Sequence, residues 1–363
     1  TLFCFADRTR AGRLLAPLIR ARADGAWIDP SGGRDRVDEI QFELHAVRIE
    51  NEDLDGLVAG HDRFPERDAG GRQHALEGGE LDALVVATPN HTHADVLAAV
   101  LDTARALGAF HEIPVSSEGL ADPAAPLPQD TRLVCVMQVN NEIGVVQECA
   151  AWLARARAAG ALFLSDGVQA AGKLALADAD LIALSAHKLH GPKGIGALWV
   201  KEGVALDPQI TGGGQEQGLR SGTLSPALCA GFGAAAALCA SLRESDAKHV
   251  DSLWQTARTL FAGWTLNGSA DHRWHGNLNV RRDDLDVARL MSDCRTLAFS
   301  AGSACASGSG RPSHVLRALG LSDREAKTAI RIGFGRYTRA EDLELAAAAI
   351  NAAAEAQAAQ GAT

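Results

Sequence analysis

The feature that most constrains this 363-residue chain is a lysine set between two histidines, in the segment SAHKLHGPKG at residues 185–194. An apolar run at residues 181–184 precedes the segment, and a second apolar run at residues 195–200 follows it. This pattern places Lys188 at the end of a strand, in a polar setting where an amine can form a Schiff base with an aldehyde. The pattern predicts pyridoxal phosphate as cofactor, whereas composition alone would favour a solvated loop lysine.

Two other apolar runs also end in polar side chains. Residues 163–166 end in Asp166, with Gln169 three positions further on, and residues 133–137 lead to Asn141. A buried carboxylate that faces the pyridine nitrogen keeps a pyridoxal ring protonated, so Asp166 suits the same cofactor. Ligands of open parallel sheets bind at the carboxyl ends of the strands, so these residues are expected to lie close together.

Six ordered blocks of the sequence resemble the cysteine desulfurases of the iron-sulfur-cluster and nitrogen-fixation type, which are fold-type I pyridoxal-phosphate enzymes. The blocks are VNNEIGVVQ (139–147), DGVQAAGK (166–173), SAHKLHGPKGIG (185–196), GGGQEQGLRSGT (212–223), SAGSACAS (300–307) and residues 312–338. The resemblance implies an α/β fold, with a large domain built on a mainly parallel sheet covered by helices and a smaller α+β C-terminal domain. We expect the large domain at residues 1–240 and the small one, which carries a cysteine loop, at residues 241–363.

The resemblance also implies how the cofactor, pyridoxal 5′-phosphate, is bound. Lys188 would hold its aldehyde carbon, Asp166 would face its pyridine nitrogen, and Gln169 would lie near its phenolic oxygen. Backbone amides in glycine-rich turns and short hydroxyl side chains are suited to a phosphate. The residues implied to hold the phosphate, the last of them from the other subunit of a homodimer, are Ser185, His187 and Thr223.

L-Cysteine is the substrate that the resemblance implies. Arg331 would bind its carboxylate, because a guanidinium binds a planar carboxylate through two parallel hydrogen bonds. Asn141 would contact both this carboxylate and the cofactor. Cys305 lies in a run of small residues at 303–310, which predicts a mobile loop. Its thiolate would take the sulfur as a persulfide, release alanine, and pass the sulfur to acceptor or iron-sulfur scaffold proteins.

The remaining cysteines and the charge limit other functions. Cys135, Cys229 and Cys239 lie in apolar or alanine-rich runs and are predicted to be small buried side chains. Seven cysteines without CxxC spacing favour neither a disulfide framework nor a metal site. The net charge of -10 argues against nucleic acid as a partner. No apolar run approaches 18 residues and no signal-peptide pattern opens the sequence, so we expect no membrane span and a cytoplasmic location.

Downstream of Lys188 the sequence predicts alternating helices and strands, which call for a parallel sheet covered by helices. Two successive helices, at residues 225–243 and 246–264, are expected to form a hinge into the smaller domain. The other expected elements are strands at 277–280, 297–300 and 329–334, and helices at 285–294, 313–319 and 340–360.

The first hundred residues depart from the family pattern. They lack its glycine- and threonine-rich phosphate-binding turn, and Leu97 stands where the family has a histidine that stacks on the cofactor. His91 or His93 could replace that histidine only if the register shifts. Residues 81–100 look instead like a strand and helix of the glucose-fructose-oxidoreductase type, although no GxGxxG occurs there.

Three functions are open on the sequence alone. The first is a cysteine desulfurase. The second is a weakly active or cofactor-poor homologue that acts as an assembly partner, and the third is a nicotinamide-dependent oxidoreductase. A visible spectrum separates the first from the others, because bound pyridoxal phosphate makes a protein yellow.

Overall fold

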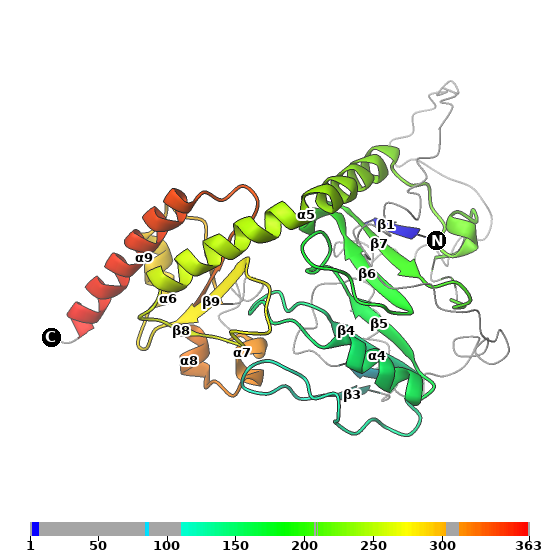
Figure 1. Cartoon of the computed structure of the whole chain (residues 1–363), viewed down its shortest axis with the longest axis horizontal. Helices are drawn as coiled ribbons and strands as arrows, with labels where there is room; N and C mark the ends of the chain where they lie inside the picture. Colours follow the sequence, from blue (N-terminus) through cyan, green and yellow to red (C-terminus); the bar gives the residue numbers. More distant parts are fainter. Residues whose placement is uncertain are drawn as a thin grey trace, which may run out of the picture.

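The computed structural model describes residues 2–6, 84–86, 110–302 except 207 and 209, and 312–361 (Figure 1). Its strands form two sheets, one of seven strands in the order β1-β7-β6-β5-β4-β2-β3 and one of four in the order β10-β11-β9-β8. The seven strands of the first sheet are β1 (Leu2–Ala6), β2 (Leu84–Val86), β3 (Phe110–Glu112), β4 (Leu133–Met137), β5 (Leu162–Asp166), β6 (Leu181–Ser185) and β7 (Ile195–Val200).

Most neighbouring strands of the first sheet run parallel. The pairs β2–β3, β2–β4, β4–β5 and β5–β6 are parallel, whereas β7 is antiparallel to both β6 and β1. Every residue of β4 and β5 is buried, which explains why their sequences, LVCVM and LFLSD, show no alternation of polar and apolar side chains. The mainly parallel sheet predicted from the sequence is confirmed.

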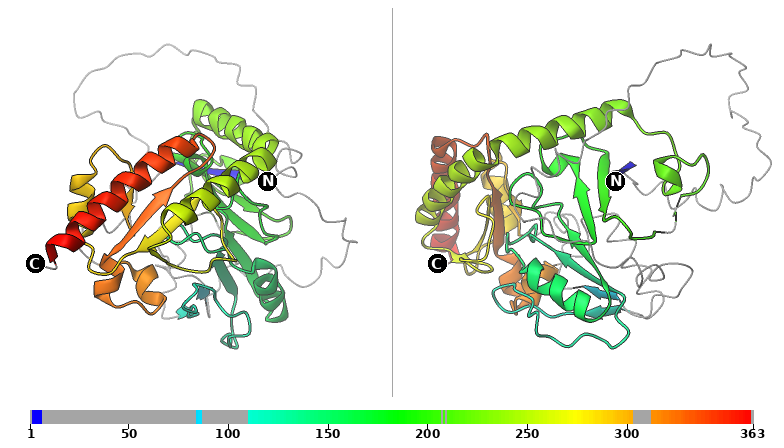
Figure 2. Two further views of the ribbon diagram at one scale, coloured as in Figure 1. Left: turned by 60° about the vertical axis from the view of Figure 1, so that its left-hand side comes forward. Right: turned by 45° about the vertical axis from the view of Figure 1, so that its right-hand side comes forward.

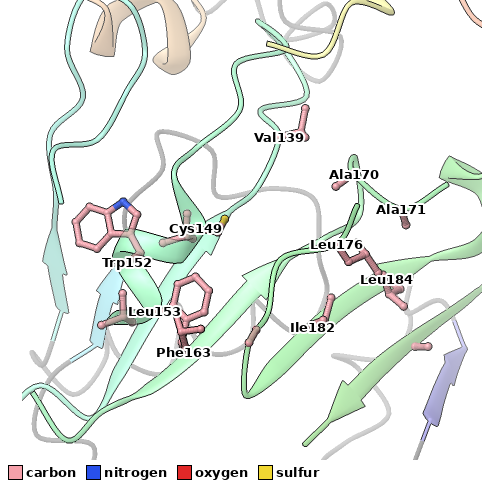
Figure 3. Packing of buried hydrophobic residues seen from close by; sticks show 14 of the residues in the cluster. Val139, Cys149, Trp152, Leu153, Phe163, Ala170, Ala171, Leu176, Ile182 and Leu184 are labelled. Carbon is pink, nitrogen blue, oxygen red and sulfur yellow. The ribbon is translucent and has the colours of Figure 1, made fainter. Parts of the chain in front are cut away.

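A helix covers one face of this sheet and completes its core. Helix α4 (Cys149–Ala158) packs against β4 and β5, and Trp152 and Phe163 are both fully buried between these layers (Figure 3). The apolar cluster continues along the sheet through Ile182 and Leu184 of β6. This packing fixes the strands whose carboxyl ends carry the polar residues singled out above.

The second sheet is antiparallel and has a core of its own. Its strands are β8 (Thr265–Leu266), β9 (Asn277–Arg281), β10 (Ser300–Ala301) and β11 (Ala329–Gly333). Leu290, Ile330 and Trp254 are buried in the second core. The helices around this sheet are α6 (Val287–Asp293), α7 (His314–Ala318), α8 (Asp323–Lys327) and α9 (Ala340–Gly361).

One long helix, α5 (Pro226–Leu260), runs from the first sheet to the second (Figure 2). The two successive helices predicted for this region are therefore wrong. Their expected junction, around residues 244 and 245, contains neither glycine nor proline, and the Ser245 hydroxyl donates to the Leu242 carbonyl at 2.9 Å. The polar residues there lie on the helix without breaking it, and the domain boundary expected at residue 240 falls inside α5.

By length and composition, α5 also matches a membrane-spanning helix, which the sequence had not suggested. Only 17% of its most apolar stretch consists of residues that are buried within the chain. Its second half, however, packs on α9 and contributes Leu253, Trp254 and Ala257 to the second core. Core helices pass the same test of length and composition, so this match is weak support for a membrane location.

The continuity of α5 can be tested with proline at its exposed centre. Ser245→Pro should lower the free energy of unfolding by about 3 kcal/mol or more, because proline removes a helix hydrogen bond and clashes with the preceding turn. Ser245→Ala, measured in the same urea titration, should stay within about 0.5 kcal/mol of the wild type. Equal stability of the two variants would mean that the helix is interrupted here.

Candidate active site

The carboxyl ends of β4, β5 and β6 meet at one edge of the first sheet, next to a cavity of about 640 Å³. Lys188 lies on the short 3-10 helix η1 (Ala186–Lys188), which follows β6 directly, and it lines the cavity. The structure brings four other predicted site residues to the same cavity, namely Asn141, Gln169, His187 and Arg331.

Asp166 ends β5 and is 1% exposed. Its Oδ1 accepts the Val168 N–H at 3.0 Å, while Oδ2 has no hydrogen-bond partner in the described part of the chain. Burial raises the pKa of this carboxyl to about 6, and the Val168 N–H opposes the rise in part. Asp166 is thus a buried acid with one oxygen left for a donor from outside the protein.

The residues predicted to hold a phosphate lie in two places. The Ser185 hydroxyl and His187 Nδ1 are 3.0 Å apart at the end of β6, and His187 faces the cavity. Thr223 is exposed and does not line the cavity. It follows a turn in which the Ser221 N–H donates to the Ile210 carbonyl at 2.8 Å. Within one chain, therefore, the structure does not bring Thr223 to the other two residues.

The turn at residues 140–144 connects the first sheet to the second. Because Arg331 lies on β11 and the turn follows β4, the cavity is bounded by both sheets. Four side chains from the second sheet and its β8–β9 connection donate to carbonyls of the turn: Arg331 to Asn141 (2.9 Å), Asn277 to Asn141 (3.1 Å), Asn279 to Glu142 (2.9 Å) and Arg273 to Ile143 (2.7 Å).

Cys305, the predicted nucleophile, lies outside the described residues. Cys135 and Cys239 are buried as predicted, but Cys229 is only partly buried. Burial is the main cause that raises the pKa of the Cys135 thiol, and the charge of Asp166 adds to it. A buried thiol with a raised pKa is a poor nucleophile, so Cys135 is unsuited to sulfur transfer.

The structure adds cavity residues that the sequence reasoning did not select. Arg336, after β11, binds both carboxylate oxygens of Asp246 on α5, with its Nη2 2.5 Å from Oδ2. The two residues are 90 positions apart, so no local pattern links them. Lys173 and Trp274 also line the cavity. Lys173 belongs to the DGVQAAGK block. Because it lies in a turn, the sequence pattern did not indicate that it lines the site.

The chain is similar in sequence to known proteins. The sequence model described as Aminotransferase class-V matches residues 74–345, so the match takes in residues 81–100 as well. A cysteine desulfurase IscS from Anaeromyxobacter sp. is 46% identical over 243 residues, which cover 63% of this chain and 60% of the relative. A mitochondrial cysteine desulfurase from Arthroderma benhamiae is 43% identical over 244 residues, covering 64% and 48%. The chain thus spans between about half and two thirds of these relatives.

The fold is also similar to a solved structure. A NifS-like protein superposes with a TM-score of 0.66 and 27% sequence identity, covering 75% of this chain and 74% of the other. The arrangement of a mainly parallel sheet and a smaller antiparallel sheet is therefore shared with a protein of known structure.

Because Asp166 is buried and its Oδ2 has no hydrogen-bond partner in the described residues, we expect the stability of the ligand-free protein to depend on pH. A carboxyl whose pKa rises from 3.8 to about 6 on folding destabilises the fold as pH rises through this range. Asp166→Asn should therefore raise the free energy of unfolding at pH 7–8 by up to about 3 kcal/mol, and the gain should shrink toward pH 4.

Urea titrations followed by tryptophan fluorescence between pH 4 and 8 give this difference. Asp180→Asn is the matched control, because buried Asp180 also accepts a backbone N–H, that of Phe163 at 2.9 Å through its Oδ2, but has no buried oxygen without a partner. This control should lose stability at neutral pH. A loss of stability in Asp166→Asn at pH 7 would contradict the assignment of an unpaired carboxylate.

Proposed function

Because the chain belongs to the class-V aminotransferase family, we propose that it is a cysteine desulfurase that uses pyridoxal phosphate to convert L-cysteine to L-alanine. The observation that carries the proposal is the single cavity that Lys188, Gln169, His187 and Arg331 line, with buried Asp166 at the adjacent strand end. The curated relatives named above are cysteine desulfurases by name. The family leaves the nicotinamide alternative without support.

The residues present fit pyridoxal phosphate. The buried Oδ2 of Asp166 lacks a hydrogen-bond donor in the described part of the chain, and a protonated pyridine nitrogen would supply one. When bound, the cofactor supplies an electron sink for bonds broken next to the substrate nitrogen. Lys188 would hold its aldehyde carbon, and Gln169 would donate to its phenolic oxygen. Ser185 and His187, already paired at 3.0 Å, would hold its phosphate.

Arg331 and Asn141 would bind the carboxylate of L-cysteine. The Arg331 Nη1 donates to the Asn141 carbonyl at 2.9 Å, and this bond fixes the plane of the guanidinium before substrate arrives. A pre-oriented guanidinium loses less side-chain entropy when it binds a carboxylate. The Lys188 Nζ would be the amine that moves a proton at the substrate Cα.

Cys305 would accept the sulfur. Its thiolate attacks the substrate sulfur, so an S–S bond forms while the substrate C–S bond breaks. The bonding electrons remain with the carbon, which takes up a proton to give alanine, and the persulfide stays on Cys305. Cys135, Cys239 and Cys294 are buried and cannot travel with a loop, which supports Cys305 for this step.

We propose that the persulfide sulfur passes to acceptor or iron-sulfur scaffold proteins in the cytoplasm. Neither nucleic acid nor a membrane has a part in this scheme. The alternative, a weakly active or cofactor-poor homologue that serves as an assembly partner, would bind little cofactor or form little persulfide on Cys305.

A homodimer completes the proposed site. Thr223 lies on an exposed turn away from its own chain's cavity, and only 17% of the most apolar stretch of α5 consists of residues buried within one chain. Both observations support a second copy that covers these surfaces and receives Thr223 at its phosphate site. Light scattering should therefore give the mass of a dimer. A monomer with fully bound cofactor would contradict this prediction.

Cys305→Ser separates cofactor binding from sulfur transfer. The variant should still bind pyridoxal phosphate and change its visible spectrum with L-cysteine, because the residues proposed for these steps are intact. It should form no persulfide and release alanine at least 100-fold more slowly, on the order of the loss seen when a nucleophile is removed.

Mass spectrometry after incubation with L-cysteine measures the added sulfur, and alanine release measures turnover. Cys229→Ser, which changes a partly buried cysteine on α5, is the control and should retain activity. Persulfide on another cysteine, or normal turnover of Cys305→Ser, would refute the assignment of Cys305. A wild-type protein that binds no cofactor would refute the proposed function as a whole.

A further inference from the structure

Lys173 lines the cavity, but the proposed function assigns it no role. Its Nζ donates to the backbone carbonyl of Gln169 at 3.1 Å and to the Gln169 side-chain Oε1 at 3.4 Å. The same Nζ lies 4.6 Å from the centroid of the Trp274 ring. All three residues line the cavity together with Lys188.

The surroundings of Lys173 disfavour its charged form. Burial is the larger cause and the charge of Lys188 the smaller one; together they lower the pKa of Lys173 to about 8, and Cys239 opposes this shift. None of the ion pairs found in the described residues includes Lys173. Its described contacts are neutral hydrogen-bond acceptors and an aromatic face. Burying an ammonium with these partners alone is unfavourable for the stability of the fold.

The contact with Gln169 has a consequence for the cavity. A lysine ammonium can only donate hydrogen bonds, so the atom of the Gln169 amide that faces it must be the oxygen. The amide nitrogen, Nε2, is then the end left to donate to a ligand. A deprotonated phenolic oxygen is an acceptor and needs a donor, so this orientation of the amide matches the role proposed for Gln169.

We propose that Lys173 is a positioning residue for the cofactor, which it affects by holding the Gln169 amide with Nε2 available to the phenolic oxygen. The inference rests on the proposed function, because it requires pyridoxal phosphate in this cavity. It assigns Lys173 a role distinct from that of Lys188, since Lys173 acts through a neutral side chain and forms no bond to the cofactor.

A double-mutant cycle of Lys173→Met and Gln169→Leu tests the proposal. Methionine keeps an unbranched side chain but removes the donor. Each single variant should bind pyridoxal phosphate roughly tenfold more weakly, as expected for the loss of one hydrogen bond to a charged group. Both should move the visible absorption maximum in the same direction. The double variant should match Gln169→Leu alone, because Lys173 acts through that residue.

The measurements are the apparent Kd, from titration of the visible absorbance, and the position of the absorption maximum. Lys173→Arg keeps a donor and should restore most of the wild-type spectrum. This recovery would show that the effect of Lys173→Met comes from the lost donor and not from misfolding. Lys193→Met changes an exposed lysine outside the cavity lining and should have no effect on either quantity.

Two failures can be told apart. Borohydride reduction and peptide mapping of the wild type should find the cofactor on Lys188, and a protein that takes up no cofactor would overturn both proposals. If the cofactor is on Lys188 but Lys173→Met resembles the wild type, or if the effects of the two substitutions simply multiply, the positioning role of Lys173 alone is refuted.

Discussion

The turn at residues 140–144 is the connection on which the two-sheet arrangement depends. Its carbonyls accept hydrogen bonds from Arg331, Asn277, Asn279 and Arg273, all of which come from the second sheet or the connection between its strands β8 and β9. Buried carbonyls need such partners, and the side chains that satisfy them are thereby fixed in place. The group proposed to bind the substrate is held by the same contact that joins the two sheets.

The sequence predicted the first sheet, and it suggested residues for the site at its edge, because both follow from local patterns. Continuous apolar runs predict strands buried on both faces, and polar residues at their ends mark the ligand-binding edge. Asp166 and Lys188 were identified in this way, and the structure places them at the ends of adjacent strands. Gln169 was selected by its place in a family-like block, and it lines the cavity.

The parts that sequence reasoning missed depend on distant contacts. A polar stretch around Ser245 suggested a break between helices, yet nothing in it disfavours a helix, and packing at both ends of α5 keeps the helix continuous. The pairing of Arg336 with Asp246 joins residues far apart in the sequence. Lys173 is chemically a common surface residue, and only its three-dimensional neighbours distinguish it.

The continuity of α5 also has a mechanical consequence. At about 1.5 Å per residue, its 35 residues form a rod roughly 50 Å long. One end of α5 packs beside β7 and the other beside α9, so the helix sets the spacing between the two cores. The cavity could widen only if α5 bent, and a helix without a proline kink resists bending. The stiffness of α5 therefore keeps Arg331 and Lys188, which belong to different sheets, on the walls of one cavity.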